Sequence, residues 1–151
     1  MKFKWEIEKL KESKQLKKSA NLILNNRIES LLSSIDIYLK DISVEKLHNV
    51  RIAIRRVRYS MELFTICYDK KIFIKFYKKV QLLQDLSGDI RDLDISLENI
   101  NYLNIDNPIR IDNEIISKAN EKKISLEENF KLKLRKFTLS KVLKDFFKHL
   151  S

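Results

Sequence analysis

The sequence predicts an all-α protein, and three observations lead to this fold class. Apolar residues recur at intervals of three and four along most of the chain, which is the spacing of one face of a helix. The 151 residues include one glycine and one proline, too few for the tight turns that sandwiches and barrels need about every 8 to 12 residues. Apolar residues make up 44% of the chain, enough for one hydrophobic core. We therefore expect one domain over residues 1–151, a single antiparallel bundle of five to six helices.

The first half of the chain predicts three helical segments. A polar amphipathic segment covers about 3–17, and a longer helix of about 19–40 carries one apolar stripe of Leu24, Ile28, Leu31, Ile35 and Leu39. The chain breaks at Asp41 to Ser43, and Ser43 is half of a capping signal because Lys46, not Glu or Gln, follows it. The third helix is expected over about 44–67.

The second half predicts three further helices, over about 71–103, 112–136 and 139–150. Asp106, Asn107 and Pro108 separate the first two of these, because proline lacks an N–H and moves its predecessor out of the α region. Gly88 falls within the first of them. We expect a disturbance there, either a kink or a close approach of another helix.

The charge distribution indicates an anionic partner. Lysine and arginine total 31 against 21 acidic residues, a net charge of +10. Such a surplus favours nucleic acid, polyphosphate or an anionic membrane surface. Residues 45–58 and 68–81 each carry five basic residues and one acidic residue, whereas 85–98 carry five acidic residues and one arginine. We therefore expect the function to lie in the middle third.

Two further features bear on the cellular compartment. Cys67 is the single cysteine and cannot form an internal disulfide, so we expect it to be a small buried residue. No apolar run resembles a signal sequence or approaches the ~20 residues of a membrane span. The expectation is a cytoplasmic protein with no membrane partner.

The predicted helix over about 44–67 carries a basic stripe. His48, Arg51, Arg55 and Arg58 fall within about 80° of one another, and apolar residues occupy the opposite side. Each guanidinium is a planar fork that grips two oxygens, so arginines along one line suit a row of phosphate groups. The alternative is a solvated face that pairs with Asp92, Asp94 and nearby glutamates.

Two segments resemble the motifs of the CHAD family, the conserved histidine α-helical domain. The first is residues 47–59, LHNVRIAIRRVRY, in which His is followed by Arg at three, a basic pair at seven and eight, and Arg at ten. The second is residues 83–94, LQDLSGDIRDLD, at about the expected distance downstream. The resemblance extends over roughly 16–150, and it is to one of the two similar halves that members typically contain.

The resemblance implies a helical module that binds inorganic polyphosphate in a basic channel, with no catalysis and no cofactor. The motif positions give the binding residues as His48, Arg51, Arg55, Arg56 and Arg58. Charge and neighbourhood add Lys75, Lys78, Lys79 and Arg91. Because the chain holds one half, we expect either a homodimer that restores the second half or a remnant with a weakened site.

Two other functions stay open. An arginine stripe also attracts the nucleic-acid backbone, although Phe64, Phe73, Phe76 and Tyr77 lie at helical spacing and favour core packing over base stacking. A Mg²⁺-dependent phosphate enzyme would use Asp85, Asp89 and Asp92, which share about 60° of a helix. The simpler interpretation is that these aspartates pair with the arginines. His48 is interpreted as an anion contact, with a structural histidine as the alternative.

Overall fold

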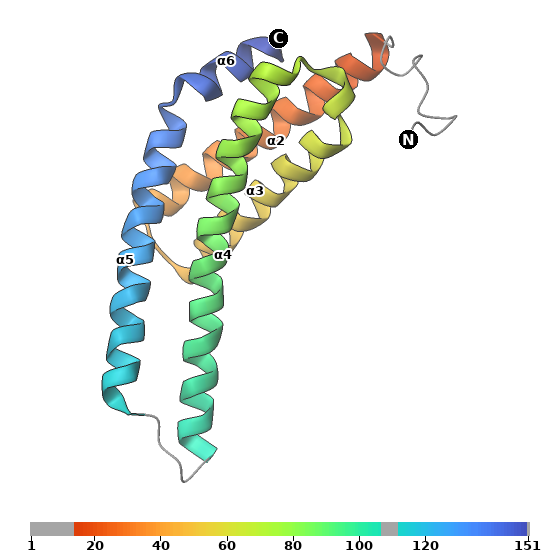
Figure 1. The fold of residues 1–151 in the computed structure, drawn as a ribbon. Coiled ribbons are helices and arrows are strands. Elements are labelled where there is room, and N and C mark those ends of the chain that lie inside the picture. Colours follow the sequence, from red (N-terminus) through yellow and green to blue (C-terminus); the bar gives the residue numbers. More distant parts are fainter. Residues whose placement is uncertain (1–13, 107–111, 151) are drawn as a thin grey trace.

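A computed structural model describes residues 14–106 and 112–150 (Figure 1). These ranges contain five α-helices and a 3₁₀ turn, and no strand: α2 (Lys14–Lys40), α3 (Val44–Leu63), η1 (Thr65–Cys67), α4 (Lys70–Asp106), α5 (Asn113–Thr138) and α6 (Lys141–His149). The all-α class is confirmed. The break at Asp106 is also where the sequence places it, at the end of α4.

Four of the described helices begin with a side-chain cap, and in α4 the carboxylate of Asp69 accepts the N–H of Lys71 at 3.1 Å. The hydroxyl of Ser43 accepts the N–H of Lys46 at 3.1 Å and starts α3. Asp112 accepts the N–H of Glu114 at 3.1 Å at the start of α5, and Ser140 does the same for Leu143 at 3.2 Å in α6. Each cap satisfies one backbone donor that the first helical turn leaves without an intrahelical partner.

Two predicted boundaries and one predicted disturbance within a helix are wrong. α2 runs without a break from Lys14, so residues 14–17 belong to it; the rest of the predicted opening segment lies outside the described residues. α3 ends at Leu63, and η1 covers the remainder. α4 passes through Gly88 as an unbroken helix, and a Cβ there would meet no atom within 4 Å. Gly88 therefore marks no close approach of another helix. A glycine in a helix interior costs about 1 kcal/mol relative to alanine, and this cost is small beside the free energy gained when the 37-residue helix packs on its neighbours.

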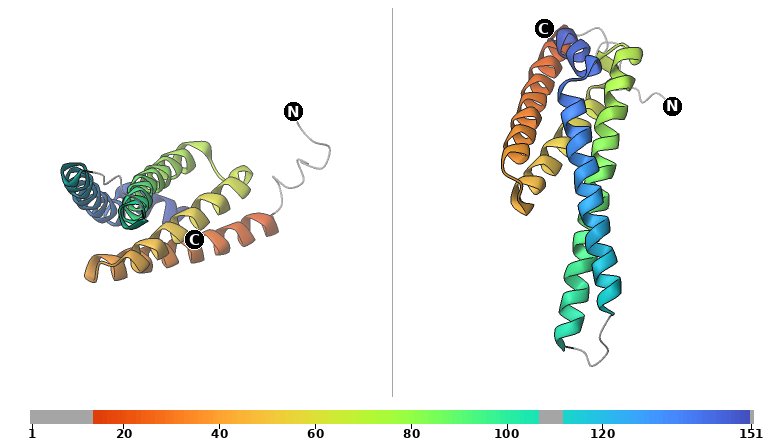
Figure 2. Two further views of the ribbon diagram at one scale, coloured as in Figure 1. Left: turned by 90° about the horizontal axis from the view of Figure 1, so that it is seen from below. Right: turned by 90° about the vertical axis from the view of Figure 1, so that its left-hand side faces the viewer.

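The helices form two antiparallel pairs and a short closing helix (Figures 1 and 2). α2 and α3 lie side by side, and α4 and α5 form a longer hairpin against which they pack. The hairpin continues past the α2–α3 pair at its lower end, whereas α6 packs on α4 at the upper end. Contact between α3 and α4 creates the surface on which the basic stripe lies.

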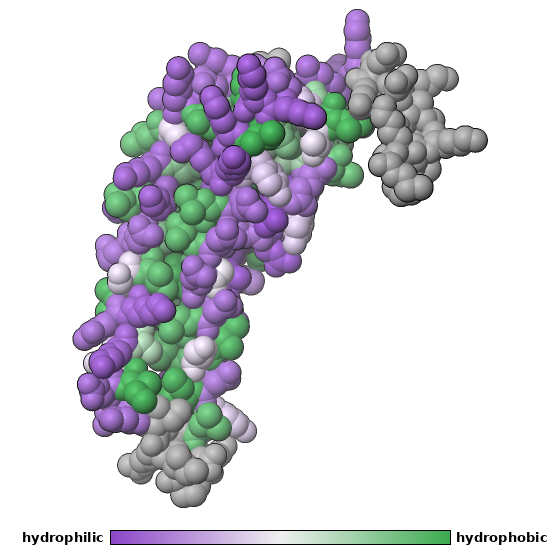
Figure 3. Space-filling model, in the orientation of Figure 1, coloured by the Kyte–Doolittle hydropathy of each residue, from purple (hydrophilic) through white to green (hydrophobic). Residues whose placement is uncertain are grey.

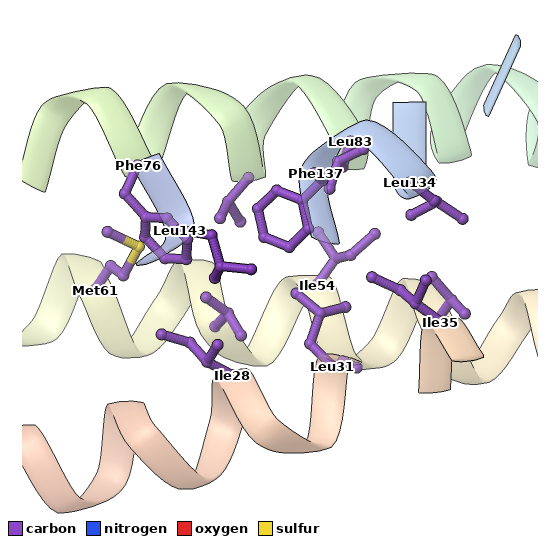
Figure 4. Close-up of a cluster of buried hydrophobic side chains, with 14 of the residues drawn as sticks. Ile28, Leu31, Ile35, Ile54, Met61, Phe76, Leu83, Leu134, Phe137 and Leu143 are labelled. Atoms are coloured by element: carbon purple, nitrogen blue, oxygen red, sulfur yellow. The ribbon is translucent and has the colours of Figure 1, made fainter. Parts of the chain in front are cut away.

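The hydrophobic core lies where the two pairs meet, and all five helices contribute to it (Figure 4). The ring of Phe76 stacks on that of Phe146, with centroids 4.5 Å apart and planes inclined by 7°, so α6 is fixed to α4. Phe64, Phe73 and Phe76 are buried, and Tyr77 is partly buried. The core interpretation of these aromatics is confirmed.

The face of the molecule in Figure 3 carries many hydrophilic residues, with a band of hydrophobic residues down the hairpin. Several large apolar side chains of the hairpin's lower half are exposed: Ile95, Tyr102, Leu103, Ile105, Ile115 and Ile124. Among the described residues, no helix combines the length and apolar character that a bilayer crossing requires.

Candidate anion-binding groove

The packing of α3 fixes the direction of its basic stripe. Its apolar side is buried against the core through Leu47, Val50, Ala53, Ile54, Val57 and Met61. With that side buried, the stripe lies along the edge of α3 that faces α4. Arginine side chains from α3 and polar side chains from α4 therefore line a common groove.

This α3–α4 groove consists of two adjoining pockets of about 370 and 450 Å³, which share Arg51. The first is lined by Arg51, Arg55, Gln84, Asp85, Ser87, Gly88, Asp89 and Asp92. The second is lined by Val44, Glu45, Leu47, His48, Arg51, Arg91 and Asp94. The structure thus brings His48, Arg51, Arg55 and Arg91 together, four of the nine residues that the sequence nominates.

Arg51 lies where the two pockets of the groove meet, and its side chain is partly buried beside two other arginines. Its Nε is buried and has no hydrogen-bond partner. Burial lowers the pKa of its guanidinium, and the neighbouring Arg91 and Arg55 lower it further, while Asp92 and Asp94 act in the opposite direction. A desolvated cation between two like charges is stabilised when an anion binds beside it. Arg51 is the residue best placed to hold an oxyanion.

Arg58, at the other end of the stripe, is already engaged. Its Nε donates to Glu62 and to the hydroxyl of Tyr77, both at 3.1 Å, and its Nη1 donates to Gln84 at 3.0 Å. Hydrogen bonding to Tyr77 is the main cause that raises its pKa. The bonds to Tyr77 and Gln84 join α3 to α4 beside the groove. Arg58 therefore has fewer free donors than Arg51 and helps to hold the two helices that form the groove.

Arg55 and His48 are exposed side chains on either side of Arg51. The guanidinium of Arg55 lies 5.9 Å from the centroid of the Tyr59 ring, a cation–π distance. Neither Arg55 nor His48 has an ion-pair partner among the described residues. Both keep their donors available to a ligand.

The aspartates of α4 lie in the groove without pairing with its arginines. No ion pair within 4.0 Å joins Asp85, Asp89 or Asp92 to a basic side chain in the described part of the chain. Asp94 pairs with Lys123 of α5 at 2.6 Å, and this bond raises the pKa of Lys123. Pairing between the aspartates and arginines, the simpler sequence interpretation, is therefore wrong. The guanidinium donors of the groove are therefore free of ion pairs with described residues, although the two pockets are lined by five carboxylates (Glu45, Asp85, Asp89, Asp92 and Asp94) and three arginines.

Four nominated residues lie elsewhere. Lys75, Lys78 and Lys79 are exposed on α4, and none of them lines the groove. At about 100° per residue, Lys75 and Lys79 lie about 160° around α4 from Tyr77, which contacts α3. Arg56 lines a different groove, between α3 and α2. The α3–α4 groove therefore draws on part of the predicted set.

On the side of α4 that faces the stripe, sequence reasoning nominated Arg91 but missed Tyr77 and Gln84 as partners of Arg58. Tyr77 and Gln84 accept hydrogen bonds from Arg58, and Arg91 lines the pocket of His48. These three residues are spaced by seven, which places them on nearly one line along a helix. This spacing of seven could have identified them from the sequence, because it places polar side chains in one row along the helix, next to the row of buried residues.

Within the described ranges, no group of three or more His, Cys, Asp or Glu side chains is arranged to hold a metal ion. A model of the CHAD domain family matches residues 4–101, a span that includes α2, α3, most of α4 and every residue of the groove. No curated protein and no solved structure matches the chain.

Proposed function

The chain belongs to the CHAD domain family, and from this premise we propose that it binds inorganic polyphosphate along the α3–α4 groove without altering it chemically. The observation that carries the proposal is Arg51, whose partly buried guanidinium has an unpaired Nε and lies between Arg55 and Arg91. The Nε is closed to solvent, so a phosphate in the groove would act on this guanidinium by bringing negative charge beside it and by accepting from the part of the side chain that lines the pockets.

The shape of the groove favours a chain of phosphates over a single anion. From His48 to Arg55 the basic lining of the groove rises about 10 Å along α3, at about 1.5 Å per residue. Arg91 extends the basic lining onto α4. A ligand with regularly repeated negative charge can contact several of these side chains at once, whereas one carboxylate or phosphate reaches one or two.

Nucleic acid is the second candidate, and Tyr59 is the observation that favours it. This side chain is 53% exposed beside Arg55, and an exposed ring next to an arginine can stack on a base. A competition experiment separates the candidates. Polyphosphate should displace a labelled single-stranded RNA at equal phosphate concentration, and a nucleic-acid reader would instead retain RNA with a base preference. Recovered polyphosphate should keep its chain length, since shortening would indicate an enzyme.

The protein should form a homodimer. The lower half of the α4–α5 hairpin extends past the α2–α3 pair and exposes Tyr102 and Ile105, which are 67% and 81% accessible. A second copy that packs on this face would cover these side chains. Two positively charged copies repel each other, so polyphosphate should strengthen the dimer.

Light scattering coupled to size-exclusion chromatography, with and without polyphosphate, measures the mass of the protein in solution and so distinguishes monomer from dimer. Ile105→Glu should yield a monomer, whereas Leu22→Glu, a change at an exposed apolar position of α2, should not. A monomer in both conditions that still binds polyphosphate tightly would contradict the dimer and leave a one-sided groove.

A further inference from the structure

A second groove lies on the other edge of α3, between α3 and α2. It has a volume of about 320 Å³ and a floor formed by Ile52 and Ala53. Its polar lining consists of Arg27, Ser30, Ser34, Asn49 and Arg56. Arg56 lies about 140° around α3 from Arg51, so the two arginines open into different grooves. We call this surface the α2–α3 groove.

The charge in the α2–α3 groove is uncompensated. No carboxylate lines it, whereas the α3–α4 groove has aspartates among its arginines. Neither Arg27 nor Arg56 forms an ion pair with a described residue. Two guanidiniums without a nearby carboxylate leave ten N–H donors for an external acceptor.

The two arginines lie at the same level of the antiparallel α2–α3 pair. Arg27 precedes the connecting residues 41–43 by about the same number of residues as Arg56 follows them, which is about 20 Å along each helix at 1.5 Å per residue. Ser34 and Asn49 are similarly matched, about 10 Å from the connection. The groove therefore presents two guanidinium forks at one end and a hydroxyl and an amide toward the other.

Hydroxyl and amide donors complete this lining. The Ser34 hydroxyl donates to the carbonyl of Ser30 at 2.9 Å, in an exposed bond that a hydroxyl can exchange by rotating. Ser30 and Asn49 have no side-chain partner among the described residues. Paired arginines with neutral donors suit a phosphoryl group, because its oxygens accept both bidentate and single hydrogen bonds.

We propose that the α2–α3 groove is a second anion site, which binds a phosphoryl group between Arg27 and Arg56 independently of the α3–α4 groove. The chemistry recognised is a phosphate or pyrophosphate unit, either free or as a segment of a long polyphosphate chain. Arg56 belongs to this second site, whereas His48, Arg51 and Arg55 of the same helix line the α3–α4 groove.

Amide chemical shifts in ¹H–¹⁵N spectra test the proposal, because they report the two grooves separately. Pyrophosphate is the first probe, since it is shorter than the ~10–12 Å diameter of a helix and cannot occupy both grooves at once. We expect it to shift the amides of Ser30, Ser34 and Asn49 in a saturable manner. The double variant Arg27→Gln/Arg56→Gln should weaken this response at least about tenfold, and Arg51→Gln should leave it unchanged.

Long-chain polyphosphate is the second probe and identifies the source of the phosphoryl group. Response to long chains alone would make the site a subsite for the polymer, and equal response to pyrophosphate would make it a site for small phosphates. If neither probe shifts the α2–α3 amides while the amides of Arg51 and Gly88 respond, the second site does not exist. If the α2–α3 amides respond and those of the α3–α4 groove do not, the second site stands and the proposed function fails.

Discussion

Replacing Arg51 with alanine is expected to weaken polyphosphate binding by about 1.5 to 3 kcal/mol, or about 10- to 150-fold in Kd. The reason is its position, since the guanidinium is partly buried, its Nε is unpaired, and Arg55 and Arg91 lie beside it. Removing the side chain deletes charge-assisted hydrogen bonds that form in a partly desolvated groove. Calorimetric titration of the variant and the wild type measures the difference.

Three further variants separate this site effect from a general loss of charge. Arg51→Lys keeps the charge but loses the planar fork, and should recover only part of the affinity. Arg135→Ala removes one positive charge from an exposed position on α5 and should change binding less than twofold. Asp92→Asn removes a groove carboxylate and should tighten binding. If Arg51→Ala titrates like Arg135→Ala, the stripe is a solvated face without a binding role.

Replacing Phe76 with alanine is expected to lower the free energy of unfolding by about 3 to 5 kcal/mol. Phe76 is fully buried, stacks on Phe146 at 4.5 Å and lies 5.9 Å from the ring of Phe137, so it joins α4 to α5 and α6. Its removal leaves a cavity where these helices meet. Denaturant unfolding followed by circular dichroism should show a lower midpoint with an unchanged m-value.

Leu132→Ala, at a half-exposed position of α5, is the matched control and should change stability by no more than about 0.5 kcal/mol. A double-mutant cycle of Phe76→Ala and Phe146→Ala should give a coupling energy of about 0.5 to 1.5 kcal/mol for the stacked pair. A loss below about 1 kcal/mol in Phe76→Ala would show that α6 is not anchored through this ring.

Local signals predicted most of the fold. Apolar spacing identified every described helix, and Ser43 placed the start of α3 because a serine hydroxyl can accept an N–H of the first turn. The error at Gly88 has a physical cause. A single glycine weakens a helix slightly, and its effect depends on whether another element approaches it. The open surroundings of Gly88 are a tertiary property that no local pattern contains.

The candidate site was predicted in part. The stripe of α3 followed from the sequence because position around a single helix depends only on residue spacing. Lys75 and Lys79 were selected by charge and neighbourhood in the sequence, which do not contain their direction on α4. The engagement of Arg58 by Tyr77 and Gln84 required knowledge of which side of α4 meets α3. Contacts between helices therefore distinguish Arg58, which joins α3 to α4, from the candidate binding arginines Arg51 and Arg55.

Direct titration of the wild-type protein with long-chain polyphosphate, at near-physiological salt and again at about twice that concentration, tests the proposed function most directly. The structure predicts saturable binding that weakens steeply as salt rises, because a polyanion releases counterions when it binds to several arginines. No binding at near-physiological salt, or an affinity that does not change with salt, would contradict polyphosphate recognition by the α3–α4 groove.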